Sequence, residues 1–221
     1  MSEIPADIEW RVSDGPIAYH EALAFMAQRA AAIRAGEARE CVWLLEHPPL
    51  FTAGTSADPA ELMNPLGLPV HAAGRGGRYT YHGPGQRVGY LMLDLDRHGR
   101  DVRCFVHALE GWIIATLANL GVAAHRAPGR IGIWVGNGPG EAKIAALGLR
   151  VKRWVTLHGF SINIAPDLAH FSGIVPCGIA EYGVTSLAAL GKETGADGVD
   201  HALKLNFPKF LKDLEQADKV S

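Results

Sequence analysis

Apolar and polar residues along this chain follow two periods, one typical of helices and one typical of strands. Leu23, Met26 and Ile33 recur at helical spacing in the alanine-rich residues 17–36, which predicts a first helix. The same spacing predicts further helices over residues 101–120 and 199–216. Pro208 is expected to interrupt the last of these, because proline has no backbone N–H to donate inside a helix.

Short apolar runs bounded by glycine and proline predict strands between the helices. The run CVWLLE at residues 41–46 stops before Pro48 and Pro49 and predicts a buried strand, whereas residues 50–67 are expected to form a loop. Other strands are predicted over residues 70–73, 79–82, 88–95, 122–125, 131–135, 142–149 and 156–164. These elements indicate an α+β fold, a mixed β-sheet with helices covering one side, in a single domain of residues 1–221.

Composition narrows the class of protein. The chain has 221 residues, 48% of them hydrophobic, and a formal charge of −2, which does not suggest a nucleic-acid or anionic membrane partner. It contains no apolar run of about 18 residues and no basic-then-apolar start, so neither a membrane span nor a signal peptide is expected. Three cysteines, far apart and outside C-x-x-C pairs, argue against disulfides or structural zinc and fit a reducing cytoplasm.

The segment RGGRYTYHGPGQRVGY, residues 75–90, has more specialised residues than a plain hairpin needs. Glycines without a Cβ let backbone N–H groups approach a ligand closely, which predicts a binding loop at Arg75–Gly77. A tight structural turn is the alternative, because a lone glycine-rich loop is weak evidence. His82 follows the loop and could orient a substrate or only satisfy the core.

Two later clusters offer a thiol and an amine. Cys177 lies in the turn-like sequence IVPCGI, whereas Cys41 lies in an apolar strand and Cys104 beside the apolar face of a helix. This contrast makes Cys177 the candidate nucleophile, although most free cysteines are small buried hydrophobes. Lys143 lies among apolar neighbours in GEAKIAALGLR, so an interior strand position is predicted instead of the solvent-facing position usual for lysine. A nearby ammonium would favour the thiolate of a cysteine.

Other polar residues are weaker candidates for a functional site. A metal site built from His47, His71, His82 and His158 lacks any close pair such as H-x-x-x-H and is not favoured. Five basic residues near Lys143 could form a solvated face or a docking surface for an acidic carrier protein. They are Arg126, Arg130, Arg150, Lys152 and Arg153.

Taken together, the three clusters resemble the lipoyl(octanoyl) transferase family from about His47 to Leu190. The family moves an octanoyl group from acyl carrier protein onto a lysine of lipoyl domains. Its catalytic lysine and cysteine correspond to Lys143 and Cys177. Its glycine-rich signature corresponds to Arg75, Gly76, Gly77, Thr80, Tyr81, His82, Gly85, Gln86 and Tyr90.

The resemblance implies the fold of biotin and lipoate protein ligase catalytic domains, no cofactor and no metal. It implies octanoyl-acyl carrier protein as donor, and as acceptors the lipoyl domains of 2-oxoacid dehydrogenase E2 subunits and the glycine cleavage H protein. Ser161 departs mildly from the family, which often has alanine there. The implied substrate-binding residues are Arg75, Gly76, Gly77, Arg78, Tyr79, Thr80, Tyr81, His82, Ala146, Leu147, Gly148, Gly159, Phe160 and Ser161.

Two other functions remain open from the sequence. An ATP-dependent lipoate or biotin ligase would share the fold and the glycine-rich loop but would need no catalytic cysteine. A non-enzymatic carrier-binding or acyl-binding module would keep an apolar pocket but form no covalent adduct. Activity without ATP, and an acyl adduct on Cys177, would separate the three.

Overall fold

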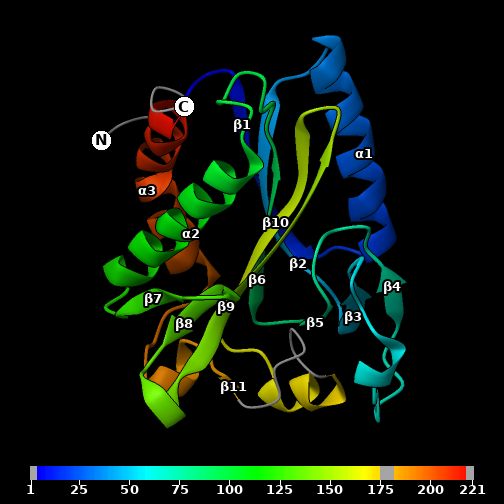
Figure 1. The fold of residues 1–221 in the computed structure, drawn as a ribbon, viewed down its shortest axis with the longest axis vertical. Helices are drawn as coiled ribbons and strands as arrows, with labels where there is room; N and C mark the ends of the chain where they lie inside the picture. Colours follow the sequence, from blue (N-terminus) through cyan, green and yellow to red (C-terminus); the bar gives the residue numbers. More distant parts are fainter. Residues whose placement is uncertain (1–3, 175–181, 218–221) are drawn as a thin grey trace.

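The computed structural model describes residues 4–174 and 182–217, arranged around one large mixed sheet (Figure 1). The strand order is β1-β2-β6-β10-β9-β8-β7, with β11 pairing with β9. β1 runs parallel to β2 and β11 parallel to β9, whereas the other neighbours are antiparallel. The strands are β1 (Ile8–Pro16), β2 (Glu40–Glu46), β6 (Gln86–Met92), β7 (Ala124–Ala127), β8 (Arg130–Val135), β9 (Ala142–Lys152), β10 (Val155–Asn163) and β11 (Gly183–Val184).

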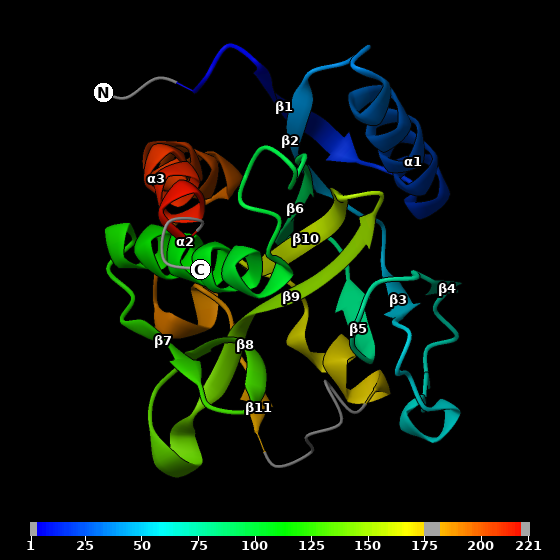
Figure 2. The same ribbon diagram turned by 45° about the horizontal axis from the view of Figure 1, so that its top comes forward.

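Helices cover both faces of this sheet. α1 (Tyr19–Ala35) lies on one face, and α2 (Val102–Asn119) and α3 (Ala196–Ala217) lie on the other (Figures 1 and 2). β2 shows the reason: Val42 and Leu44 pack toward α2 and α3, whereas Cys41, Trp43 and Leu45 pack toward α1. The expectation of one covered side is therefore wrong, because the central strands are apolar on both faces.

A smaller sheet lies beside the end of the large one. Its strands are β3 (Leu50–Ala53), β4 (Val70–Ala72) and β5 (Tyr79–His82), in the order β4-β3-β5. β3 and the short helix Pro59–Glu61 fall inside the stretch predicted as a loop, which corrects that prediction. β5 brings the glycine-rich segment against the large sheet, where Gly76 N–H donates to Leu149 C=O over 2.9 Å.

α2 and α3 pack on one another through aromatic rings. Trp112 stacks on Phe210 with ring centroids 5.0 Å apart, and its indole N–H donates to Leu203 C=O over 2.9 Å. α3 continues through Pro208, so the predicted interruption is wrong. Burial of Phe207 and Phe210 on either side of the proline holds the helix together despite the missing N–H.

β9 and β10 form a hairpin that leads directly into the site. Its two-residue turn consists of Arg153 and Trp154, both with positive φ (50° and 65°), as a type I′ turn requires. The remaining predicted strands and the second helix are confirmed to within a few residues. Within the described residues, no helix is long and apolar enough to cross a membrane.

Candidate functional site

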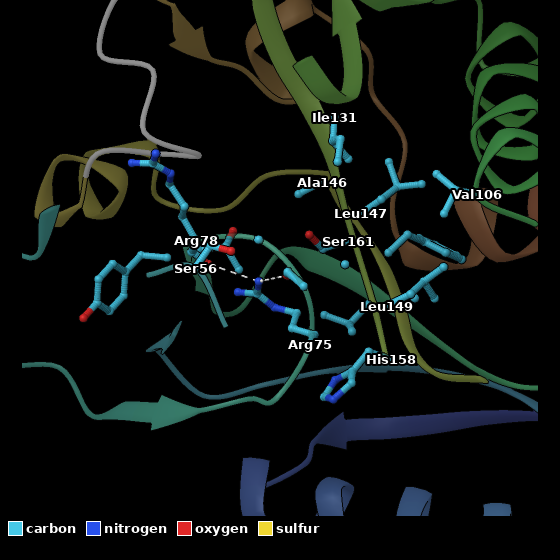
Figure 3. Close-up of a pocket in the computed structure, with 18 of the residues that line it drawn as sticks. Ser56, Arg75, Arg78, Val106, Ile131, Ala146, Leu147, Leu149, His158 and Ser161 are labelled. Carbon is cyan, nitrogen blue, oxygen red and sulfur yellow. Dashed lines mark hydrogen bonds between the residues drawn. The ribbon is translucent and has the colours of Figure 1, made fainter. Parts of the chain in front are cut away.

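A pocket of about 420 Å³ opens where the glycine-rich segment meets β9 and β10. Figure 3 shows Arg75, Arg78 and Ser56 on one side of it, and Leu147, Ile131 and Val106 on the other. Of the predicted substrate-binding residues, those that line the pocket are Arg75, Gly76, Gly77, Arg78, Tyr79, Thr80, His82, Ala146, Leu147, Gly148, Gly159, Phe160 and Ser161. Three segments far apart in sequence therefore meet around one pocket.

Tyr81 is placed elsewhere. Tyr81 lies on the face of β5 opposite to Thr80 and His82 and packs with Phe51 and Phe171, and its hydroxyl lies 2.7 Å from His170 Nδ1. In the described part of the chain, Tyr81 is not among the pocket residues.

Arg75 fixes the shape of the glycine-rich loop. Its buried guanidinium donates to the carbonyls of Gly76 (2.9 Å), Arg78 (3.1 Å) and Thr52 (3.1 Å), and to Thr52 Oγ1 (2.8 Å). A Cβ on Gly148 would lie 2.7 Å from Arg75 Cδ. Arg75 thus ties the loop to β3, and Gly148 leaves the space that its stem occupies.

The inner end of the pocket is polar and built from histidine and tyrosine. Tyr19, His82, Tyr90 and His158 line it, and His47 lies behind them. His47 Nδ1–H donates to the carbonyl of Ile17 (2.6 Å), so Nε2 accepts from the Tyr90 hydroxyl (2.6 Å).

Burial keeps these imidazoles neutral. It lowers the pKa of His47 and of His158 to about 4 and that of His82 well below its ordinary value. Burial also raises the pKa of Tyr19 to about 12. The described residues contain no group of three or more His, Cys, Asp or Glu side chains arranged to hold a metal ion.

A chain of hydrogen bonds sets the tautomer of His82. Gln86 Nε2 donates to Asn163 Oδ1 (2.9 Å), and Asn163 Nδ2 donates to the carbonyl of Thr185 (2.9 Å). Gln86 therefore turns its carbonyl oxygen toward His82, and His82 Nδ1–H donates to it (2.7 Å). Thr185 N–H in turn donates to the carbonyl of Lys143 (2.9 Å), so the chain ends on the backbone of Lys143.

Lys143 lies in β9 and is 6% exposed, as its apolar neighbours predicted. Its Nζ lies 4.8 Å from the centroid of the Trp134 ring, and Val184 of β11 pairs with it on the other side. Cys177 lies outside the described residues. The described residues around it are tied to the fold: Ile174 bridges to Leu62, and Gly183 pairs with Ala142. Cys41 is buried in β2, where burial raises its thiol pKa to about 12, and Cys104 is half-buried in α2.

The five basic residues do not form one surface. Arg126 and Arg130 are on β7 and β8 and pair with Glu110 and Glu141, over 2.9 and 2.5 Å. Lys152 and Arg153 lie at the β9–β10 turn, and ten residues of strand, about 30 Å, separate Arg153 from Lys143. Of the two alternatives, a docking surface that joins Arg126 and Arg130 to Lys152 and Arg153 in a single patch is therefore not formed. Arg130, with Arg78, lies at the pocket itself.

Sequence reasoning missed several pocket residues. Tyr19, Val106 and Ile131 carry no local signal, since each comes from an element whose place against β9 is set by the tertiary fold. Tyr90 was visible in the glycine-rich signature, and His158 was one of several histidines without a distinguishing neighbour.

The fold is the one that lipoate protein ligases have. Two solved structures share the fold: "lipoate-protein ligase A bound with ATP" (TM-score 0.70, 17% identity, 92% of this chain and 86% of that one) and a putative lipoate protein ligase from T. acidophilum with bound lipoic acid (TM-score 0.67, 16% identity, 93% and 85%). At these identities the likeness extends to the fold alone.

Sequence comparison gives the family. The profile described as lipoyl protein ligase A/B catalytic domain matches residues 18–208, and this chain belongs to that family. Among its relatives, the octanoyltransferase of Sphingopyxis alaskensis is 69% identical over 219 residues (99% of this chain, 100% of the relative). The octanoyltransferase of Rhizorhabdus wittichii is 64% identical over 218 residues (97% and 98%).

Proposed function

We propose that this protein is an octanoyltransferase that moves an octanoyl group from a thioester donor onto a lysine of lipoyl domains. The observation that carries the proposal is the near-full-length identity of 57–69% to relatives named octanoyltransferase. The pocket supports it, because thirteen residues expected to bind the acyl group lie together around one cavity. The donor is octanoyl-acyl carrier protein, and the acceptors are the lipoyl domains of 2-oxoacid dehydrogenase E2 subunits and the glycine cleavage H protein.

The pocket suits an acyl tail. Burying an octanoyl chain contributes on the order of 5 kcal/mol, at about 0.8 kcal/mol per CH₂. Each methylene changes the binding constant only a few-fold, so selection of eight carbons needs a wall that rejects longer chains. The histidines and tyrosines at the inner end are suited to form that wall, since His47 is hydrogen-bonded at both ring nitrogens and Gln86 holds His82.

Chemistry at the site begins with the Cys177 thiolate, which Lys143 as an ammonium stabilises. The thiolate attacks the carbonyl carbon of the donor thioester, and the bond between that carbon and the donor sulfur breaks. The leaving thiolate takes a proton from Lys143, which leaves an octanoyl-Cys177 thioester and a neutral Lys143 amine. One thioester replaces another, so this half-reaction needs no ATP.

The acceptor lysine completes the cycle. It enters as an ammonium and loses two protons overall, one to the neutral Lys143 and one to solvent. Its nitrogen attacks the acyl carbon, the amide forms, and the Cys177 thiolate leaves. Lys143 is again an ammonium and the site is ready for another donor. Gly183, six residues after Cys177, pairs beside Lys143, and six extended residues span at most about 20 Å, so the chain permits their contact.

Intact-protein mass spectrometry tests the proposal. Mixing the protein with octanoyl-carrier protein, without ATP, should add one octanoyl group to the enzyme, and adding a lipoyl domain should move it to the acceptor. Cys177→Ser should remove both the adduct and turnover, whereas Cys104→Ser, in α2 and away from the pocket, should keep them. Transfer that requires ATP would favour a ligase, and binding without an adduct would favour a carrier-binding module.

A further inference from the structure

Two residues of β8, Gly132 and Trp134, lie against the side chain of Lys143. Trp134 is its register partner across β8 and β9, and Gly132, two residues earlier, lies on the same face of the strand. A Cβ on Gly132 would lie 2.9 Å from Lys143 Cε and 3.2 Å from Cδ. The stem of the lysine thus crosses the strand over Gly132, and its Nζ lies 4.8 Å from the centre of the Trp134 ring.

The Trp134 ring is held in place from several sides. It is 2% exposed, and Tyr182 meets it edge-on with centroids 5.5 Å apart. The guanidinium of Arg130 lies over both rings, 4.4 Å from Trp134 and 4.1 Å from Tyr182. A ring packed in this way cannot follow the lysine, so it defines where the ammonium lies.

Arg130 brings a second positive charge to the same ring, within about 9 Å of Lys143 Nζ. Its charge is compensated, because Arg130 pairs with Glu141 over 2.5 Å. His125 also contacts Glu141, over 2.8 Å, and these two partners lower the pKa of the Glu141 carboxyl. Glu141 therefore stays ionised and offsets the repulsion that Arg130 would exert on Lys143.

We propose that Trp134 is a positioning residue for Lys143: its ring face holds the ammonium in place and favours the charged form, and Gly132 provides the space for the stem. This inference rests on the proposed catalytic role of Lys143. The face of an aromatic ring is negative, and indole attracts a cation more strongly than the phenyl ring of phenylalanine does. The charged form is the one that stabilises the Cys177 thiolate and protonates the leaving sulfur.

The ring should therefore set how far acyl-enzyme formation extends into alkaline pH. Lys143 must be charged for this half-reaction, so the rate falls where Lys143 loses its proton. Among the described residues, the charged and titratable groups around the Trp134 ring are Arg130, with its partners Glu141 and His125, and Tyr182. All of them remain if only the electron density of the ring is changed. Weakening the ring face should move the alkaline limb to lower pH by roughly half a unit to one unit.

Fluorinated tryptophans weaken the negative potential of the ring face, since each fluorine withdraws electron density while the shape of the ring stays nearly constant. We would place mono-, di- and tetrafluorotryptophan at position 134 by nonsense suppression and measure single-turnover acyl-enzyme formation from octanoyl-pantetheine against pH. The ¹³Cε resonance of Lys143 would be titrated in the same proteins. We expect both midpoints to move to lower pH with each added fluorine, and Trp134→Phe to give an intermediate shift.

Trp154 provides the matched control, because its ring also carries a cation, Arg100 at 4.5 Å, but lies at the β9–β10 turn. The same substitutions there should move neither midpoint. Midpoints that stay fixed across the series at position 134, or that move equally for position 154, would overturn the inference. Failure of the unsubstituted enzyme to form an adduct would instead overturn the proposed function, and the ¹³C titration would still decide whether the ring favours the ammonium.

Discussion

At the scale of single residues, the site depends on a few close contacts, such as that between Arg75 and Gly148, where a larger side chain would collide. The Arg75 guanidinium is fixed by four acceptors on the loop and on β3, and its stem passes directly over Gly148. The sequence predicted both residues as part of a binding site. The sequence could not predict that Gly148 leaves the space for the Arg75 side chain, because the two residues are 73 positions apart and meet only in the folded chain.

Gly148→Ala tests this contact. Its Cβ would lie 2.7 Å from Arg75 Cδ, and Arg75 cannot move away without losing its hydrogen bonds. We expect a loss of roughly 1–3 kcal/mol in unfolding free energy, as for overpacking in a core, and weaker binding of the octanoyl donor. Gly15→Ala is the control, since its Cβ would meet nothing within 4 Å. Urea unfolding would measure both, and equal stability of the two variants would contradict the expected collision.

At the scale of elements, hydrophobic periodicity predicted the helices and strands whose apolar pattern is complete within their own residues. β5 has the predicted bounds, and α2 differs by one residue at each end, helped by the Asp101 side chain that accepts from Arg103 N–H and Cys104 N–H. β1 and β11 were not predicted. β11 has only two residues and therefore no pattern of its own, whereas Ile8, Trp10 and Val12 of β1 do alternate with polar residues and were missed. Tertiary packing also overrode the local signal of Pro208 in α3.

Pro208 should therefore destabilise a helix that forms in spite of it. Pro208→Ala restores a backbone N–H and removes a penalty of about 3 kcal/mol, partly offset by the greater freedom of the unfolded chain. We expect a net gain of roughly 1–2 kcal/mol in urea unfolding. Pro59→Ala is the control, because proline at the start of a short helix costs little. A Pro208→Ala protein no more stable than the parent would show that α3 is already relaxed around the ring.

At the scale of the whole molecule, the site lies where two sheets meet, and this is what a single sequence reveals least. The residue types were predictable, and the resemblance to a family supplied which of them act together. The neighbours that complete the pocket were not, because Tyr19 comes from the start of α1, Val106 from α2 and Ile131 from β8. Their positions follow from the strand order, which no local pattern encodes.

The buried histidines of this junction should make the stability of the whole molecule depend on pH. Burial holds the pKa of His47 and of His158 at about 4, below the value near 6.5 in the unfolded chain. Between these values the unfolded state binds more protons, so the unfolding free energy falls as pH falls from about 6.5 to about 4. At pH 5 each histidine should lower the free energy of unfolding by about 2 kcal/mol relative to pH 7.

The variant His158→Asn tests this dependence, because asparagine suits the positive φ of 63° at that position. It should reduce the difference between the unfolding free energies measured in urea at pH 7 and at pH 5 by about 2 kcal/mol. The exposed His20→Asn should leave the difference unchanged. If His158→Asn kept the full difference, burial of His158 would not be a source of the acid sensitivity.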